Sequence, residues 1–215
     1  MRRDGRSEPA LALIEKCRRT AAVWLALSLC AASMTLAQVP AMRVKNTVHN
    51  LSTSGPGTIR ATTESRICVF CHTPHNSVPN SPLWNRAMPT ATYQIYSSPS
   101  LTANVGQPTG SSKLCLSCHD GTIALGSVLS SPTPISMTGG VTTLIGDGNL
   151  GTDLSDDHPI SFVYQDALSG SNPEFVSRPD LPPQIRLDDW GEVQCTSCHD
   201  PHDNTNGNFL VTDAT

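Results

Sequence analysis

Three short motifs combine two cysteines and a histidine at a spacing that suits one kind of covalent chemistry. Cys-x-x-Cys-His occurs at residues 68–72, 115–119 and 195–199, which are named motif 1, motif 2 and motif 3 here. Two thiols three positions apart can each add to one vinyl group of a porphyrin, while the imidazole of the next residue reaches the iron. A single copy would also suit a zinc half-site or a redox dithiol. Three copies in 215 residues instead predict three covalently bound haems of the c type.

The cysteine count agrees with this prediction. The chain has eight cysteines, of which Cys17 and Cys30 lie in a leader that we expect to be removed. Three haems with two thioether bonds each would use every remaining thiol and would leave none for a disulfide or a zinc cluster. The predicted haem-attachment residues are Cys68, Cys71, Cys115, Cys118, Cys195 and Cys198.

The histidines predict how the irons are coordinated. The motif histidines are expected to be the proximal ligands, and four further imidazoles are available for the opposite faces. Two imidazoles on one iron give a low reduction potential and leave no open position for a substrate, which favours an electron carrier. The expected proximal ligands are His72, His119 and His199, and the candidate distal ligands are His49, His75, His158 and His202.

Two of the candidate distal ligands follow a motif histidine by three residues. His75 and His202 are therefore too close to reach the opposite face of the same porphyrin, and we expect each to ligate a neighbouring haem. Four candidates for three positions leave one imidazole over. It is idle, or it is donated to another molecule, or it serves a fourth haem site beyond Thr215. His49, on a short arm before the turn at 54–57, is the best candidate for self-association by donation.

Residues 1–37 have the pattern of an export signal. Basic residues are followed by an apolar run of about 16 residues, Ala21 to Leu36, which is short for a membrane span of about 20. Cleavage is expected after Ala37, and the alternative of a lipoprotein at Cys30 is disfavoured by the bulky Leu29. We therefore expect a periplasmic or extracellular protein without a stable membrane anchor.

The remaining residues, 38–215, are predicted to form a single domain with three haems. The chain contains 17 prolines and 15 glycines and has few long apolar periodic runs. We therefore expect only a small hydrophobic core. We expect a mostly irregular chain with short α-helices at the haem sites and little β-structure, organised around stacked haems, and an apoprotein that is largely unfolded. The expected elements are a helical turn at 67–71, a helix within 111–128 ending near Gly121 or Gly126, a short strand after His158 and an edge strand at 187–193.

The charge balance restricts the partners. The leader holds six basic and three acidic residues, and the remaining eight basic and fifteen acidic residues give a net charge near −7. Nucleic acid is therefore not an expected partner. Other redox proteins, in particular basic ones, and an extracellular mineral or soluble electron acceptor are compatible with this charge.

Several segments together resemble a known family. The chain is similar to the small exported multihaem c-type cytochromes of metal-reducing and related bacteria, with doubled Cys-x-x-Cys-His motifs, over most of residues 49–211. The resemblance implies bis-His electron-transfer haems in a fold with little regular secondary structure. Some similar proteins polymerise into extracellular haem-lined filaments in which a histidine near the N-terminus ligates a haem of the next subunit, a role that His49 would match. Many relatives have four or more haems, whereas three motifs occur here. The segments are Cys68 to Asn76, Pro82 to Arg86, Ser112 to Gly126, Asp156 to Phe162 and Gln194 to Asn204.

The expected function is therefore transfer of single electrons through three low-potential haems, with a haem-lined filament as one version of it. The alternative is a multihaem reductase with one open haem. Such an enzyme often has an altered attachment motif, with Lys in place of His, and none of the three motifs is altered in this way. A redox or ligand sensor would usually be fused to a signalling domain, for which the sequence leaves no room.

Overall fold

The computed structural model describes residues 41–78, 81, 83–165 and 175–213. These residues belong to a single compact unit of the chain. The predicted export signal and its cleavage site lie outside the described residues. Within the described ranges, no helix is both long enough and apolar enough to cross a bilayer.

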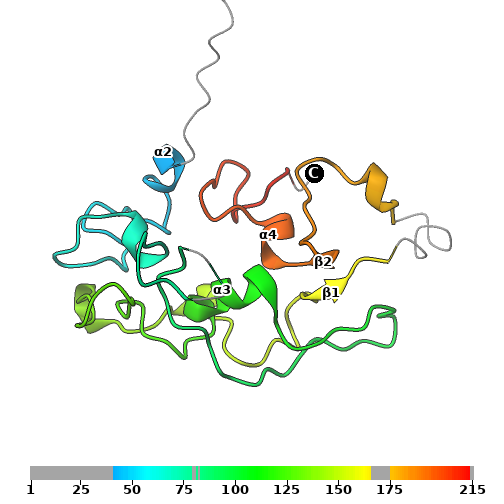
Figure 1. The fold of residues 1–215 in the computed structure, drawn as a ribbon, viewed down its shortest axis with the longest axis horizontal. Coiled ribbons are helices and arrows are strands. Elements are labelled where there is room, and N and C mark those ends of the chain that lie inside the picture. The colour runs from blue at the N-terminus through cyan, green and yellow to red at the C-terminus, as the bar shows by residue number, and fades with distance from the viewer. Residues whose placement is uncertain (1–40, 79–80, 82, 166–174, 214–215) are drawn as a thin grey trace, which may run out of the picture. The chain divides into compact units, whose positions relative to one another are not determined.

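Regular secondary structure is sparse in the described part of the chain (Figure 1). The helix α3 has ten residues, and α2 and α4 have four each. Most of the remaining chain runs in turns and irregular segments, which confirms the prediction of a mostly irregular fold with short helices and little β-structure. The α-helices are α2 (Ala41–Val44), α3 (Gly110–His119) and α4 (Cys195–Cys198), the strands are β1 (Phe162–Val163) and β2 (Glu192–Val193), and 3₁₀ turns occur at Cys68–Phe70, Thr138–Gly140, Gly146–Gly148 and Arg178–Asp180.

Each motif lies on a short helix. Motif 1 begins with the 3₁₀ turn Cys68–Phe70, motif 2 occupies the last five residues of α3, and α4 consists of the two cysteines of motif 3 and the residues between them. Beyond α3, Gly121 has a φ of +70°, a left-handed conformation that glycine adopts without steric cost. The predicted helix end near Gly121 is thus confirmed. The alternative end at Gly126 is wrong, because Gly126 lies in a loop against the carbonyl oxygen of Ile135, where a Cβ would come within 2.0 Å.

The two strands form a minimal antiparallel pair that leads into motif 3. Phe162 is opposite Val193, and Val163 is opposite Glu192. The strand predicted after His158 is confirmed as β1. Of the strand predicted at 187–193, only the last two residues are extended, because the chain turns at Asp188, whose carbonyl accepts the Gly191 N–H at 2.9 Å.

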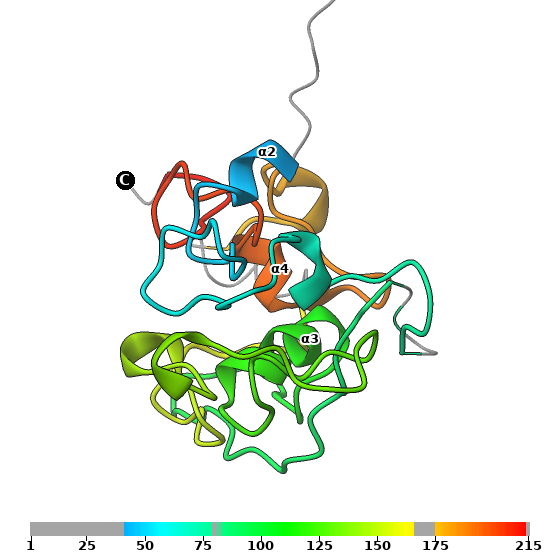
Figure 2. The same cartoon turned by 90° about the vertical axis from the view of Figure 1, so that its left-hand side faces the viewer.

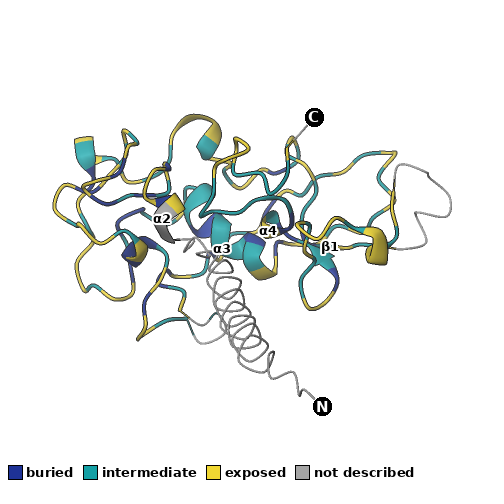
Figure 3. Ribbon diagram, turned by 90° about the horizontal axis from the view of Figure 1, so that it is seen from above, coloured by how far each residue is buried: buried dark blue, intermediate teal, exposed yellow. Residues whose placement is uncertain are grey.

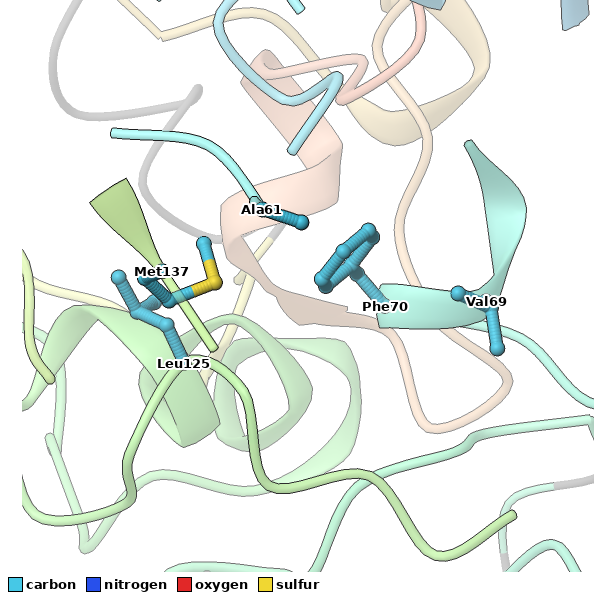
Figure 4. Close-up of a cluster of buried hydrophobic side chains, with 5 residues drawn as sticks. All are labelled: Ala61, Val69, Phe70, Leu125 and Met137. Atoms are coloured by element: carbon cyan, nitrogen blue, oxygen red, sulfur yellow. The ribbon is translucent and has the colours of Figure 1, made fainter. Parts of the chain in front are cut away.

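The apolar core consists of two small clusters that include residues of motifs 1 and 2. One contains Val69 and Phe70 of motif 1 (Figure 4), and the partly buried Cys71 and Cys118 pack against this cluster. The other contains Leu116 of motif 2. Buried stretches are short and interrupted along the described chain (Figure 3). The clusters are Ala61, Val69, Phe70, Leu125 and Met137, and Tyr93, Leu116 and Leu154.

Two consecutive polar residues join motif 1 to motif 2. Asn85 donates its backbone N–H to the Cys71 carbonyl at 2.9 Å and its side-chain amide to the Val69 carbonyl at 2.5 Å. Arg86 is completely buried, and its guanidinium donates to backbone carbonyls of motif 2 and of the loop after it, beside the Cys118 thiol. The acceptors are the carbonyls of Ser117, Ile123, Ala124, Leu125 and Ser127, at 2.8 to 3.5 Å.

Replacing this buried guanidinium should destabilise the protein strongly. Arg86→Met removes the donors of five carbonyls at a completely buried position, and we expect the free energy of unfolding to fall by about 3–4 kcal/mol. The matched control is Arg60→Met, since Arg60 is exposed and its guanidinium reaches the Gly57 carbonyl at 3.4 Å; this change should stay within about 0.5 kcal/mol. Denaturant unfolding followed by circular dichroism measures both, and equal midpoints would contradict the role given to Arg86.

A second polar cluster joins motif 3 to α3 and β1. The side-chain oxygen of Gln194 accepts the hydroxyl hydrogens of Ser112 at 2.6 Å and Ser161 at 3.0 Å. Its amide nitrogen donates to Thr109 Oγ1 at 3.1 Å, and the Cys195 N–H donates to Ser112 Oγ at 3.0 Å. Gln194 directly precedes Cys195, so these bonds hold α4 against α3 and place motif 3 beside motif 2 (Figure 1).

Candidate functional site

Six of the seven histidines form three facing pairs. Every pair contains one motif histidine and one of the imidazoles predicted to be a distal ligand. Two pairs have nearly parallel rings, and the third has nearly perpendicular rings. The pairs, with the distance between ring centroids and the angle between ring planes, are His72 with His202 (6.1 Å, 13°), His119 with His49 (6.1 Å, 86°) and His199 with His158 (6.3 Å, 11°).

These distances suit a single metal ion between the two rings of each pair. A bond from a metal to an imidazole nitrogen measures about 2.0–2.1 Å, and the ring centroid lies about 1.1 Å further out, so two rings on opposite sides of one ion have centroids about 6.3 Å apart. In the described residues, no group of three or more His, Cys, Asp or Glu side chains is placed to hold a metal ion. Paired imidazoles suit a metal that takes two ligands from the protein and the rest from another group, as haem iron does.

Hydrogen bonds orient the paired rings. Five of the six paired imidazoles have Nδ1 within hydrogen-bond distance of an oxygen acceptor. An Nδ1–H that donates in this way fixes the ring and leaves Nε2 free to bind a metal, as is usual for metal-ligating histidines. The acceptors are Pro201 O for His49 (3.0 Å), Gly148 O for His119 (2.8 Å), Asn208 O for His199 (2.8 Å), Pro159 O for His158 (3.4 Å) and Asp200 Oδ1 for His202 (3.2 Å).

The His49–His119 pair is the more enclosed part of the site. Burial lowers the pKa of both imidazoles, although each ring also bonds a backbone carbonyl that acts in the opposite direction. The His49 ring packs on Phe209, with centroids 4.2 Å apart. Both imidazoles are therefore kept in the neutral form that ligates metals.

One four-residue segment contacts all three pairs. In 199–202, His199 belongs to the third pair, the carbonyl of Pro201 orients His49 of the second, and His202 belongs to the first. The segment lies beside the chain after α2, as Figure 2 shows, and the Arg43 guanidinium forms an ion pair with Asp203 there. The three candidate metal positions are consequently neighbours, although their ligands come from distant parts of the sequence.

The six motif cysteines are free thiols, and some of them meet across motifs. Burial raises the pKa of Cys71 to about 12. The thiols of Cys115 and Cys195 share a hydrogen bond, which helps to raise the pKa of Cys115 and lowers the pKa of Cys195 to about 6. Motif 2 and motif 3 thus approach each other at their first cysteines.

His75 is the one predicted ligand that is not brought into a pair. Its side chain is exposed, and within the described residues its imidazole has no ring contact and no hydrogen bond. Only its backbone is held, by the hydroxyl of Thr73. His49, which we predicted as a donor to another molecule, faces His119 of its own chain. Donation by His49 between copies stays a prediction, but an intramolecular role now has a geometric basis.

Trp84 provides a further test of whether a haem would fit. Its indole Nε1 is the only buried side-chain nitrogen or oxygen in the described residues that lacks a hydrogen-bond partner. The Trp84 ring lies edge-on to His72, with centroids 5.9 Å apart. An unpaired buried donor costs about 1–3 kcal/mol, so its presence fits a bound group that supplies an acceptor, such as a haem propionate.

Sequence reasoning did not assign the polar residues that position the motifs. Asn85, Arg86 and Gln194 had no individual role in the prediction, and their contacts join residues far apart in sequence. Gln194 directly precedes motif 3 and Arg86 lies 14 residues after motif 1, and no spacing in the sequence indicates that either side chain is buried. Trp84 stands in a Pro-rich segment, where an aromatic residue is expected to pack in the core or against a haem.

Comparison of the sequence with protein-family models and with curated proteins gives no match. The function must therefore be inferred from the motifs and from the geometry of the site.

Proposed function

We propose that this protein transfers single electrons through three covalently bound c-type haems, one at each motif, with two imidazoles on every iron. One observation carries the proposal: each motif histidine faces one of the predicted distal imidazoles at the centroid distance of 6.1–6.3 Å that a shared iron requires. The Nδ1 hydrogen bonds of the paired rings, the free motif thiols and the unpaired Trp84 indole support it.

The cysteines and the histidines would have different roles in holding the cofactor. The cysteines of each motif would attach the porphyrin by thioether bonds, and the paired imidazoles would occupy both axial positions. The bound iron porphyrin supplies the one-electron chemistry between the ferric and ferrous states. Two imidazole ligands keep the reduction potential low and leave no position for a substrate.

The alternative, a multihaem reductase, needs an iron with one open face. All three motif histidines have an imidazole opposite them, so this alternative has less support than the carrier. Export to the periplasm or the cell exterior, and a basic redox protein or an extracellular acceptor as the partner, belong to the same proposal. They are supported by the leader pattern and by the net charge near −7 of residues 38–215.

Haem stoichiometry and ligand binding test the proposal. Intact mass and the pyridine haemochrome spectrum of the exported protein should give three haems per chain, and the oxidised protein should not bind cyanide or nitrite. A variant with Cys195→Ala and Cys198→Ala is the matched control and should lose a single haem. Fewer than three haems in the wild type would overturn the haem assignment, and an oxidised haem that binds nitrite would favour the reductase.

A further inference from the structure

We propose that the iron between His49 and His119 is an electronic centre of a different type from the other two, because its two imidazole planes are perpendicular. This inference rests on the proposed function. It deepens that function by assigning a distinct state to one identified haem, using side chains whose orientation is given by the structure.

Contacts with the rest of the protein fix the orientation of both rings of the perpendicular pair. The His119 ring is held by its Nδ1 bond to the Gly148 carbonyl at 2.8 Å. The His49 ring is held by the Pro201 carbonyl at 3.0 Å and by its packing on Phe209. These contacts come from two distant parts of the chain, Gly148 and the loop 200–209, and the angle between the two rings is 86°.

The other two pairs are held in the opposite arrangement. His72 and His202 are inclined by 13°, and His158 and His199 by 11°. His202 is fixed by the Asp200 carboxylate at 3.2 Å, and His199 by the Asn208 carbonyl at 2.8 Å. Two parallel pairs and one perpendicular pair therefore occur within one chain.

Ring orientation matters because the filled π orbital of an imidazole overlaps only those iron d orbitals that share its direction. Two parallel rings act on the same d orbital, raise it above its partner and separate the two in energy. Two perpendicular rings act on one d orbital each, so the two stay nearly equal in energy. The unpaired electron of a low-spin ferric ion occupies this pair of orbitals, and its magnetic anisotropy reports their separation. Axial ligation is also one of the levers that set the potential of a haem.

Low-temperature EPR of the fully oxidised protein measures the magnetic anisotropy of each haem, and therefore distinguishes parallel from perpendicular imidazole pairs. We expect two kinds of low-spin signal: a rhombic signal from two haems, and a strongly anisotropic signal with a large maximum g value from one haem. Their integrated intensities should stand at 2 to 1, as the ring angles require. Three rhombic signals, or more than one strongly anisotropic signal, would overturn the inference.

Two matched variants assign the signals. His49→Ala should remove the strongly anisotropic signal and produce one high-spin haem, to the same extent at every protein concentration. His158→Ala should remove half of the rhombic intensity and leave the strongly anisotropic signal unchanged. A strongly anisotropic signal that survives His49→Ala contradicts the inference. If His49→Ala does not accumulate, loss of that signal in His158→Ala contradicts it equally well.

Failure of this inference can be distinguished from failure of the proposed function. Three attached haems that are all low-spin but give equal signals would leave the electron carrier standing and remove the distinct centre. Fewer than three haems, or a high-spin haem in the concentrated wild type, would contradict the carrier itself. A high-spin fraction in the wild type that vanishes as the protein associates would contradict the intramolecular pairing. It would support donation of an imidazole from one copy to a haem of another.

Discussion

Replacement of His202 by alanine should convert one haem of the three from low-spin to high-spin. The His202 ring faces His72 at 6.1 Å with an angle of 13°, and no other imidazole forms a ring pair with His72 in the described residues. Its removal leaves the iron at motif 1 with His72 alone. We expect a high-spin EPR signal equivalent to one haem, binding of one cyanide per chain and a higher potential for that haem, because an imidazole ligand is lost.

His75→Ala is a closely matched control. His75 and His202 both occupy the last position of a His-x-Pro-His sequence that begins with a motif histidine. His75, however, is exposed, and within the described residues its imidazole forms no ring pair with another histidine and no hydrogen bond. The His75→Ala protein should keep three low-spin haems and bind no cyanide. If His75→Ala produced the high-spin haem and His202→Ala did not, the pairing of the first site would be wrong.

The same pair of variants bears on the surplus imidazole. With His49, His158 and His202 each facing a motif histidine, His75 is the imidazole left over from the seven. A wild-type protein whose three haems are saturated without His75 has no iron in need of a donated ligand. The filament version of the proposed function would then have to use contacts other than histidine donation.

A chain without attached haem should not fold. Ten hydrophobic residues of the described chain are buried, and those that form clusters make only the two small groups of five and three residues. The imidazole pairs add three sites at which the opposing side chains are held apart by about the width of an axially ligated iron. Without the porphyrins, the chain loses the surfaces that these segments would cover. We expect the free energy of unfolding to fall from the usual range of about 5–15 kcal/mol to zero or below.

The experiment replaces all six motif cysteines by alanine and keeps every histidine. Far-UV circular dichroism, protease resistance and NMR dispersion should then show an unfolded chain, whereas the wild type resists protease. The variant with alanine at Cys195 and Cys198 alone should open mainly in the segment after α4, because the hydrogen bonds of Gln194 and Ser112 still join α4 to α3. A cooperative unfolding transition in the six-alanine chain would show that the protein core suffices.

The helical turn at each motif could be predicted from the sequence alone. Two cysteines and a histidine within five residues are placed by a single helical turn, and the structure confirms such a turn at each motif. The sequence was also enough to predict the shortage of regular structure, since frequent proline and glycine prevent long helices and strands. The end of α3 near Gly121 was predictable because glycine tolerates the left-handed conformation there.

Only the tertiary structure decided which imidazole faces which motif. The partners are 130, 70 and 41 residues apart in sequence, and no local rule relates residues at such distances. The polar contacts of Asn85, Arg86 and Gln194 that set the motifs side by side are equally non-local. The angle between two facing rings depends on acceptors from further segments, such as Pro201 and Gly148. The spacing of two cysteines and a histidine is thus set within one turn of the chain, whereas the pairing of imidazoles and the orientation of their rings arise only when distant segments pack together.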